Sequence, residues 1–120
     1  MHTLMIVDDS NITRRKIERT QQSSLFNVVA SVGNGVDAVN AFTQFNPSVI
    51  TMDLTMPEMD GIEAIEKIRT LSDSVRILVI SALNDKATAI KALQKGAQGF
   101  VCKPFTDYEL QDALLEIIEE

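Results

Sequence analysis

Five polar side chains that could do chemistry each follow a short apolar segment of the chain: Asp8, Asp9, Asp53, Ser81 and Lys103. Three carboxylates brought together repel one another, and this raises their pKa values unless a cation neutralises them. Sites built from carboxylate oxygens suit Mg²⁺ or Mn²⁺. A neighbouring ammonium and hydroxyl suit phosphoryl oxygens, and a carboxylate can be the nucleophile that accepts the phosphoryl group. The set therefore predicts metal-assisted phosphoryl transfer, provided that the fold brings these residues together.

The elements that must position these residues follow an alternating pattern. Short apolar, β-branched runs, typical of strands, alternate with longer amphipathic runs, typical of helices. Ser10, Asn34 and Thr106 are expected helix N-caps, and Pro47 is expected to end the second helix. Strands are predicted at 3–7, 28–32, 48–52, 76–80 and 99–102, and helices at 11–22, 36–45, 84–95 and after Gly61 and Thr106.

Five such pairs predict one α/β domain over residues 1–120. Strands that read as continuous apolar runs favour a parallel sheet covered by helices on both faces. Five units are too few for an eight-stranded barrel. A doubly wound, flavodoxin-like (βα)₅ sheet with strand order 2-1-3-4-5 is therefore expected.

This topology would gather the five polar residues, because ligands bind at the carboxyl ends of the strands in open α/β sheets. Any one of them alone is typical of a turn or a helix cap. Their joint occurrence at one edge favours a site. Asp53 is the predicted nucleophile, because its strand is central and places it in the middle of that edge.

Composition restricts the other classes of function. The 120 residues carry a net charge of −6 and contain one Cys and one His. A disulfide scaffold and a zinc site built on His and Cys are therefore disfavoured. The acidic balance argues against direct nucleic-acid binding. No apolar run approaches the roughly 20 residues of a membrane helix, and the N-terminus lacks signal-peptide features. A cytoplasmic protein without membrane contact is expected.

Four blocks of the sequence carry a family resemblance. They are Asp8-Asp9, the stretch 52–61 (MDLTMPEMDG), Ser81-Ala82 and 103–105 (KPF). Their residues and spacing resemble the response-regulator receiver domain, and the resemblance covers essentially the whole chain. Within that family the sequence is most similar to the CheY-like, stand-alone receivers of chemotaxis, particularly those with Thr two residues after the phosphorylated Asp and Ser at the switch position.

The resemblance implies a phosphorylation site with its metal. Asp53 would accept a phosphoryl group from a sensor histidine kinase. Asp8, Asp9, Asp53 and the backbone carbonyl of Thr55 would hold Mg²⁺ or Mn²⁺. Thr55 and Leu83 would flank the acyl phosphate and influence its lifetime. The chain would catalyse only its own phosphotransfer and slow autodephosphorylation, so it is not expected to be an enzyme in the ordinary sense.

The resemblance also implies a switch. Lys103 would contact the phosphoryl oxygens and would be joined to Pro104 by a cis peptide bond. Ser81 would move toward the phosphoryl group, and Phe100 would pack inward into the space that Ser81 leaves. Phe100 replaces the tyrosine of many chemotaxis receivers, so an output contact that needs a hydroxyl is in doubt. The surface of the fourth helix, fifth strand and fifth helix would then bind a partner, such as a component of the flagellar motor switch.

Three alternatives stay open. The chain could be a receiver cut from a longer, for example transcriptional, response regulator. It could also be a phosphorelay intermediary. From a different class, residues 33–38 fit G-x-G-x-x-A, with Asp53 twenty residues after Gly33, as in a dinucleotide fingerprint. The short chain and the unexplained Asp8-Asp9 pair count against that third interpretation, and a turn with an Asn34 cap is favoured.

Four basic residues in the first predicted helix have two interpretations. Arg14, Arg15, Lys16 and Arg19 form this basic cluster. They could be a solvated helix face, or they could dock the acidic domain of the phosphodonor. The sequence leaves both open.

Overall fold

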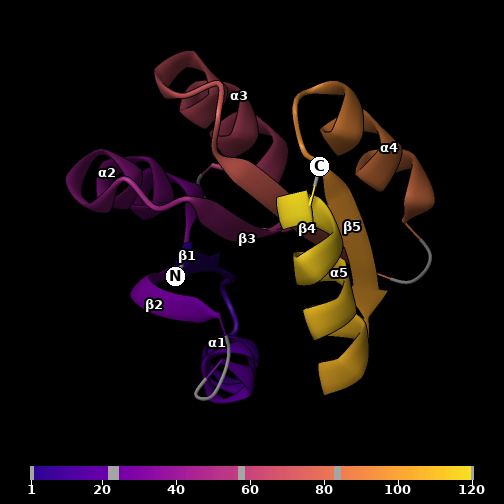
Figure 1. Ribbon diagram of the computed structural model, residues 1–120. Helices are drawn as coiled ribbons and strands as arrows, with labels where there is room; N and C mark the ends of the chain where they lie inside the picture. The colour runs from indigo at the N-terminus through magenta and orange to yellow at the C-terminus, as the bar shows by residue number, and fades with distance from the viewer. Residues whose placement is uncertain (1, 22–24, 57–58, 83–84, 120) are drawn as a thin grey trace.

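The computed structural model describes residues 2–21, 25–56, 59–82 and 85–119. Within these ranges strands and helices alternate along the chain (Figure 1). The strands are β1 (His2–Val7), β2 (Phe26–Val32), β3 (Val49–Asp53), β4 (Arg76–Ala82) and β5 (Gly99–Lys103). The helices are α1 (Asn11–Thr20), α2 (Gly35–Phe45), α3 (Gly61–Leu71), α4 (Lys86–Gln94) and α5 (Asp107–Glu119).

The strands form one parallel sheet in the order β2-β1-β3-β4-β5, as the sequence predicted. Strands β1 and β2 begin earlier than predicted, and β3, β4 and β5 run further at their carboxyl ends. Asp53 still pairs with Ile80, and Ser81 and Ala82 pair with Cys102 and Lys103. Asp53, Ser81 and Lys103 are therefore residues of the strand ends rather than of the following loops, and the sheet ladder fixes their backbones.

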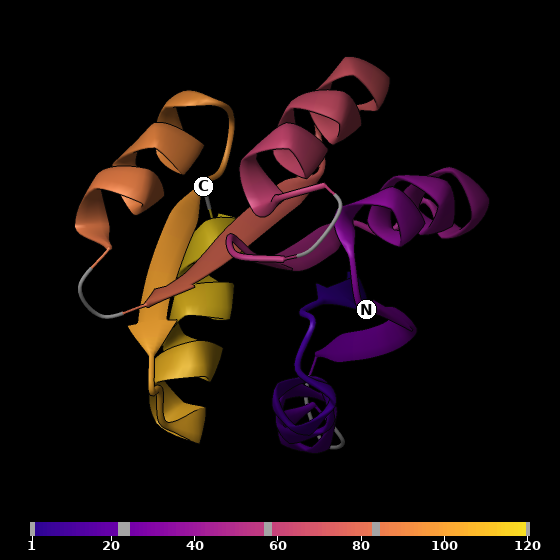
Figure 2. The ribbon, with the colours of Figure 1, turned by 180° about the vertical axis from the view of Figure 1, so that it is seen from behind.

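Helices cover both faces of the sheet, which explains the continuous apolar runs of the inner strands. Figures 1 and 2 show α1 and α5 on one side of the sheet and α2, α3 and α4 on the other. Alternate residues of β1 belong to two separate hydrophobic cores. Met5 and Val7 pack on the α2–α3 side of the sheet. Leu4 and Ile6 pack on the α1–α5 side. Each of these four side chains is fully buried.

The predicted helix caps are confirmed. Ser10 and Asn34 each accept a hydrogen bond from the backbone N–H three residues later, at 3.2 and 2.8 Å. Thr106 and Glu109 form a reciprocal pair of hydrogen bonds before α5, each 3.0 Å long, which is a capping box. These bonds satisfy backbone donors at helix starts that lie at or near the predicted site.

Some element boundaries differ from the prediction. Helix α1 ends at Thr20 rather than at residue 22, and position 22 lies outside the described residues. Helix α4 spans 86–94 rather than 84–95, and position 84 is likewise not described. Helix α2 ends before Pro47 because Asn46 adopts a left-handed conformation, with φ of 45°. Phe45, the last residue of this helix, is 46% exposed.

Candidate functional site

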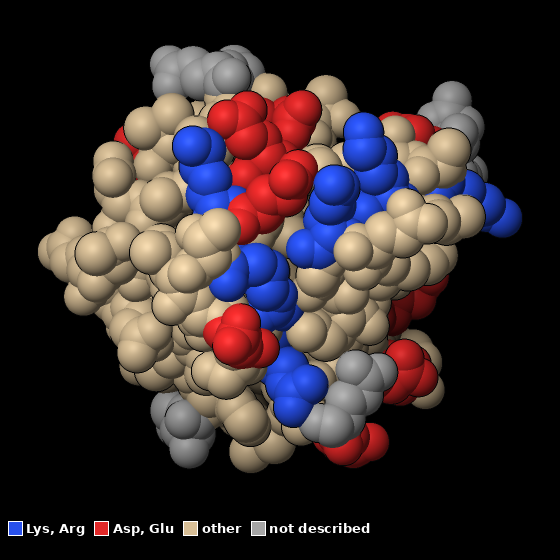
Figure 3. Space-filling view, turned by 90° about the horizontal axis from the view of Figure 1, so that it is seen from above, with Lys and Arg blue, Asp and Glu red and all other residues tan. Residues whose placement is uncertain are grey.

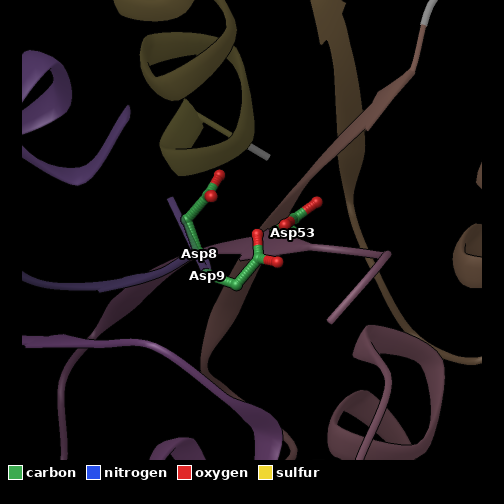
Figure 4. Close-up of side chains that lie close together, drawn as sticks. All are labelled: Asp8, Asp9 and Asp53. Atoms are coloured by element: carbon green, nitrogen blue, oxygen red, sulfur yellow. The ribbon is translucent and has the colours of Figure 1, made fainter. Parts of the chain in front are cut away.

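The carboxyl-end edge of the sheet, called the rim below, brings three carboxylates together. Asp8 and Asp9 extend from the end of β1, and Asp53 extends from the end of the neighbouring β3 (Figure 4). Each offers one oxygen within 4.8 Å of the others. Asp8 and Asp53 are buried, whereas Asp9 is exposed. These three residues are the acidic cluster.

Backbone and ammonium groups hold the two buried carboxylates. The Ser10 N–H donates to Asp8 Oδ1 at 2.8 Å, and the Thr55 N–H donates to Asp53 Oδ1 at 3.3 Å. The Lys103 ammonium reaches across from β5 and lies 3.0 Å from Asp8 Oδ2 and 3.7 Å from Asp53 Oδ1. The predicted convergence of the carboxylates with Lys103 is therefore present in the fold.

The protonation of Asp53 reflects opposing influences. The pKa of its carboxyl is raised from 3.8 to about 6, and burial is the largest cause. The negative charge of Asp8 also raises the pKa of Asp53, and Asp9 adds a smaller effect of the same sign. The Lys103 ammonium and the Thr55 N–H lower it. The cluster therefore carries more negative charge than Lys103 alone neutralises.

The donor set fits a hard divalent cation. Asp8 Oδ2 is buried and accepts no hydrogen bond from any described residue. Among these residues, the Lys103 ammonium is the only recorded ion-pair partner of this oxygen. Magnesium prefers oxygen ligands and keeps several waters when one or two carboxylates bind it. Three carboxylate oxygens within 4.8 Å, one of them on the solvent side, suit such a partly hydrated ion. The role predicted for the Thr55 carbonyl stays a prediction.

Of the predicted switch residues, Lys103 contacts the carboxylates, whereas the structure records no hydrogen bond between Ser81 and a carboxylate of the described residues. Ser81 is buried, and its Oγ lies 4.0 Å from Cys102 Sγ rather than against Asp53. Phe100 lies on β5 in register with Val79 and is 40% exposed. The Lys103-Pro104 peptide bond is cis, as predicted. Leu83 lies outside the described residues.

Two features of the site had no counterpart in the prediction. A Cβ at Gly61 would overlap the backbone carbonyl of Asp53, so only glycine lets α3 begin this close to β3. A cavity of about 400 Å³ opens beside the Lys103 side chain. Its lining residues are Thr13, Lys16, Ala82, Lys103, Pro104 and Phe105. These come from three separate parts of the chain, so no local pattern of residues indicates the cavity.

Comparison with known proteins decides the family. Residues 4–115 match the family model described as the response regulator receiver domain. The chain belongs to that family. Among curated relatives, this receiver domain is 38% identical to the chemotaxis protein CheY of Listeria monocytogenes over 120 residues, covering all of this chain and 98% of the relative. It is 39% identical to CheY of Bacillus subtilis over 119 residues, covering 99% and 96% of the two chains.

Solved structures agree with this assignment. The receiver domain superposes with a TM-score of 0.92 on a chain from the CheX–CheY–BeF₃–Mg²⁺ complex of Borrelia burgdorferi. That chain is 29% identical, and the match covers 98% of this chain and 89% of that one. The response regulator domain of Thermotoga maritima CheB gives a TM-score of 0.90 at 29% identity, with 100% and 98% covered. The receiver domain is thus CheY-like in sequence and in fold.

The residues of the dinucleotide fingerprint have structural roles in this receiver domain. Asn34 caps α2, and its amide also donates to the Asp37 carboxylate at 3.1 Å. A Cβ at Gly35 would overlap the backbone carbonyl of Met59, so this glycine allows the segment before α3 to lie close to the start of α2. An acidic residue in the first turn makes this helix start a poor site for pyrophosphate.

The basic cluster of the receiver domain divides into two pairs. Arg14 donates to the Asp8 carbonyl, and Lys16 donates to the Phe105 carbonyl, each at 2.6 Å. Lys16 Nζ also lies 4.6 Å from the centre of the Phe105 ring. Arg15 and Arg19 are exposed. Two of the four residues are therefore bonded to backbone carbonyls next to the rim, and the other two are exposed. Docking of a phosphodonor by this cluster stays a prediction.

The face of the molecule that carries α3 and α4 has charges of both signs (Figure 3). On the face that carries α3 and α4, acidic and basic side chains lie next to one another (Figure 3). Lys95 and Glu66 make one such exposed pair, at 3.9 Å. None of the helices in the described ranges combines the length and the apolar character that crossing a bilayer demands.

Proposed function

We propose that this receiver domain is a phosphorylation-dependent signalling switch, in which Asp53 accepts a phosphoryl group from a sensor histidine kinase. One observation carries the proposal. The buried Asp53 carboxylate shares the rim with two further carboxylates and with the Lys103 ammonium, 3.7 Å from its Oδ1. Repelling carboxylates add no stability to a fold, so a chemical role accounts for the cluster better than a structural one.

The Asp53 carboxylate is the nucleophile. One of its oxygens forms a bond to phosphorus, and the bond from phosphorus to the donor nitrogen breaks. The electron pair leaves with the imidazole of the donor, which takes a proton from water. The product is an aspartyl phosphate, and attack of water on phosphorus later returns the carboxylate and inorganic phosphate. With a pKa of about 6, Asp53 is largely ionised, and so nucleophilic, at neutral pH.

The other rim residues neutralise and position the phosphoryl group. Asp8, Asp9, Asp53 and the Thr55 carbonyl would hold Mg²⁺ or Mn²⁺, which when bound supplies charge neutralisation for phosphoryl oxygens. The Lys103 ammonium, already 3.0 Å from Asp8, is placed to contact the same oxygens. Thr55, whose N–H is bonded to Asp53, flanks the phosphoryl group on the solvent side.

The output of the switch is a change of the α4–β5–α5 surface. The aspartyl phosphate offers the Ser81 hydroxyl a charged acceptor in place of its weak contact with Cys102. When Ser81 moves toward Asp53, the Phe100 ring, 40% exposed at the edge of the sheet, packs inward. This is a population shift between two conformations, which phosphorylation biases because only one of them contacts the phosphoryl group.

The partner is a protein, and the process is chemotaxis or motility control. The similarity to two CheY proteins supports the process, and the Borrelia CheX–CheY complex is an example of a CheY-like chain bound to a protein partner. A flagellar motor switch component would be such a partner. We propose no enzymatic activity on other molecules, because the reaction begins and ends on Asp53 of the chain itself.

The proposal is tested by intact mass after incubation with Mg²⁺ and a small-molecule phosphodonor such as phosphoramidate. The chain should gain one phosphoryl group. The Asp53→Asn variant and a sample with chelator should gain none, while Glu66→Gln, an exposed carboxylate on α3, should react like the parent chain. Labelling that persists in Asp53→Asn places the nucleophile elsewhere and overturns the proposal.

The alternatives make different predictions in the same experiment. A receiver cut from a longer regulator and a phosphorelay intermediary both become phosphorylated on Asp53, but the intermediary also returns its phosphoryl group to a histidine-containing domain. A dinucleotide-binding domain gains no phosphoryl group under any condition and binds NADH instead. Intact mass followed by an NADH titration separates a dinucleotide-binding domain from the two receivers. Transfer of the phosphoryl group from Asp53 to a histidine-containing domain then identifies the intermediary.

A further inference from the structure

Arg14 of α1 holds the backbone at the point where β1 enters the acidic cluster. Its Nη1 donates to the Asp8 carbonyl at 2.6 Å, and its Nη2 donates to Asn11 Oδ1 at 3.1 Å. The second bond fixes the plane of the guanidinium, because a planar fork with two anchored arms has little rotational freedom. The bonded carbonyl belongs to the peptide that joins Asp8 to Asp9.

That peptide matters because no hydrogen bond or ion pair with a described residue orients the Asp9 side chain. A backbone N–H and Lys103 hold the Asp8 carboxylate, and Thr55 and Lys103 hold the Asp53 carboxylate. For Asp9 the structure records no hydrogen bond or ion pair of the carboxylate with any described residue, and the side chain is exposed. The direction in which Asp9 leaves the backbone is therefore what aims it at the cluster.

Gly33 makes room for this contact. A Cβ at position 33 would lie 3.2 Å from Arg14 Nη1 and 3.9 Å from the Asp8 carbonyl oxygen. The first separation is closer than carbon and nitrogen atoms normally approach, so a side chain there would displace the guanidinium by a few tenths of an ångström. The φ angle at Gly33 lies outside the left-handed region, so alanine fits the backbone itself. The absence of a side chain at Gly33 thus serves the Arg14 contact.

We infer that Arg14 is a positioning residue of the metal site: its guanidinium holds the Asp8–Asp9 peptide and thereby orients the Asp9 carboxylate toward the cation. The inference rests on the proposed function, because it needs the acidic cluster to bind a cation. It assigns Arg14 a role other than docking a phosphodonor. Residues that orient metal ligands typically change affinity by roughly 10–100-fold when they are replaced.

The two effects that Arg14 could have on cation binding differ in sign. A guanidinium near the site repels Mg²⁺, so loss of its charge alone would strengthen binding. Loss of a positioning contact would weaken it. Binding of magnesium chloride to the purified chain, measured by calorimetry without any phosphodonor, therefore distinguishes them. Arg14→Met should bind Mg²⁺ about tenfold more weakly than the parent chain, and Arg14→Lys, which keeps the charge and one donor, should lie between the two.

Arg15→Met is the matched control. Arg15 is the next residue of α1, has the same charge and is exposed. Its removal should leave the affinity unchanged or slightly raise it. An Arg14→Met variant that binds Mg²⁺ as tightly as the parent chain, or more tightly, overturns the inference.

Gly33→Ala provides a second test, in which the Arg14 guanidinium is displaced rather than removed. It should weaken Mg²⁺ binding in the parent chain, because its Cβ displaces the guanidinium. It should have no further effect in the Arg14→Met background, because the group that it displaces is then absent. Equal effects in both backgrounds would show that Gly33 acts without Arg14 and would overturn the inference.

The failure of this inference is distinguishable from the failure of the proposed function. If the parent chain itself does not bind Mg²⁺, the cation site of the proposed function is wrong. If the parent chain binds Mg²⁺ and Arg14→Met binds it equally well, only the role of Arg14 is wrong.

Discussion

Asp53 is a buried carboxylate whose neighbours act on its protonation in opposite directions. Burial and the charges of Asp8 and Asp9 raise its pKa, and Lys103 and the Thr55 N–H lower it, with a net result of about 6. A raised pKa in the folded state means that the folded chain binds the proton more tightly than the unfolded chain does. The ionised form of Asp53 therefore destabilises the fold when no cation is present.

The first prediction concerns stability against pH. In the presence of chelator, the free energy of unfolding should fall as the pH rises from about 4 to about 6. The reason is that the unfolded chain releases the Asp53 proton near pH 3.8, whereas the folded chain releases it near pH 6. Asp53→Asn has no such proton and should be more stable than the parent chain at pH 7, by up to about 3 kcal/mol. Urea unfolding at several pH values measures this. The advantage should vanish below pH 4, and an advantage that persists there contradicts the explanation.

The second prediction concerns Lys103. Replacing it with Met removes the cation that lies 3.7 Å from Asp53 Oδ1, so the pKa of Asp53 should rise further. Carbon NMR of the Asp53 carboxyl, titrated in chelator, measures it directly. Lys95→Met is the control, because Lys95 makes an exposed pair with Glu66 on another face of the molecule. A pKa of Asp53 that is equal in both variants would show that Lys103 does not act on this carboxyl.

At the scale of elements, strand ends and helix starts set the geometry of the rim. Continued pairing of β3 with β4 holds the backbone of Asp53, and α3 begins directly against it at Gly61. The capping box of Thr106 and Glu109 starts α5 just after the cis Lys103-Pro104 bond. Each functional side chain therefore belongs to a strand end or lies beside the start of a capped helix, where its position is well defined.

The third prediction belongs to the junction of β3 and α3. Gly61→Ala should reduce the rate of Asp53 phosphorylation, because its Cβ would overlap the Asp53 carbonyl and force the two elements apart. Ile68→Val is the matched control: it trims a fully buried side chain of the same helix, about 10 Å further along, at a cost of about 1 kcal/mol. Intact-mass time courses compare the two. Equal rates for both variants would mean that general destabilisation accounts for any loss.

At the scale of the whole molecule, the site exists only in the folded chain. Its carboxylates lie at the ends of two strands and its ammonium at the end of a third, and positions 8, 53 and 103 are far apart in sequence. A cation that binds this assembly binds the folded state and not the unfolded chain. Cation binding is therefore coupled to global stability.

The fourth prediction follows from this coupling. Saturating Mg²⁺ should raise the melting temperature of the parent chain. At a Mg²⁺ concentration one hundred times the Kd, the free energy of unfolding should increase by about 2.7 kcal/mol. Asp53→Asn should respond less, because it offers a weaker ligand set. Thermal unfolding followed by circular dichroism, with and without chelator, provides the comparison. An equal response in both variants would place the bound cation away from the acidic cluster.

Local patterns predicted some residues better than others. The caps at Ser10, Asn34 and Thr106 depend on neighbours within three residues, and all three are confirmed. Periodicity does not say how far each apolar residue of α2 is covered, because the position of the helix on the sheet leaves Phe45 46% exposed while Phe42 is buried. The contact of Arg14 with the Asp8 carbonyl depends on how α1 lies against β1, which the charge pattern of the helix does not contain.

The sequence by itself determined the alternation of strands and helices, the parallel sheet and the identity of the residues at the strand ends. These follow from side-chain periodicity and from short-range capping, which act along the chain. Only the tertiary structure decided that Lys103 lies 3.0 Å from Asp8, that Ser81 meets Cys102, and that the pKa of Asp53 rises to about 6. Such properties depend on burial and on distances between groups far apart in sequence, and these are defined only once the two cores have packed.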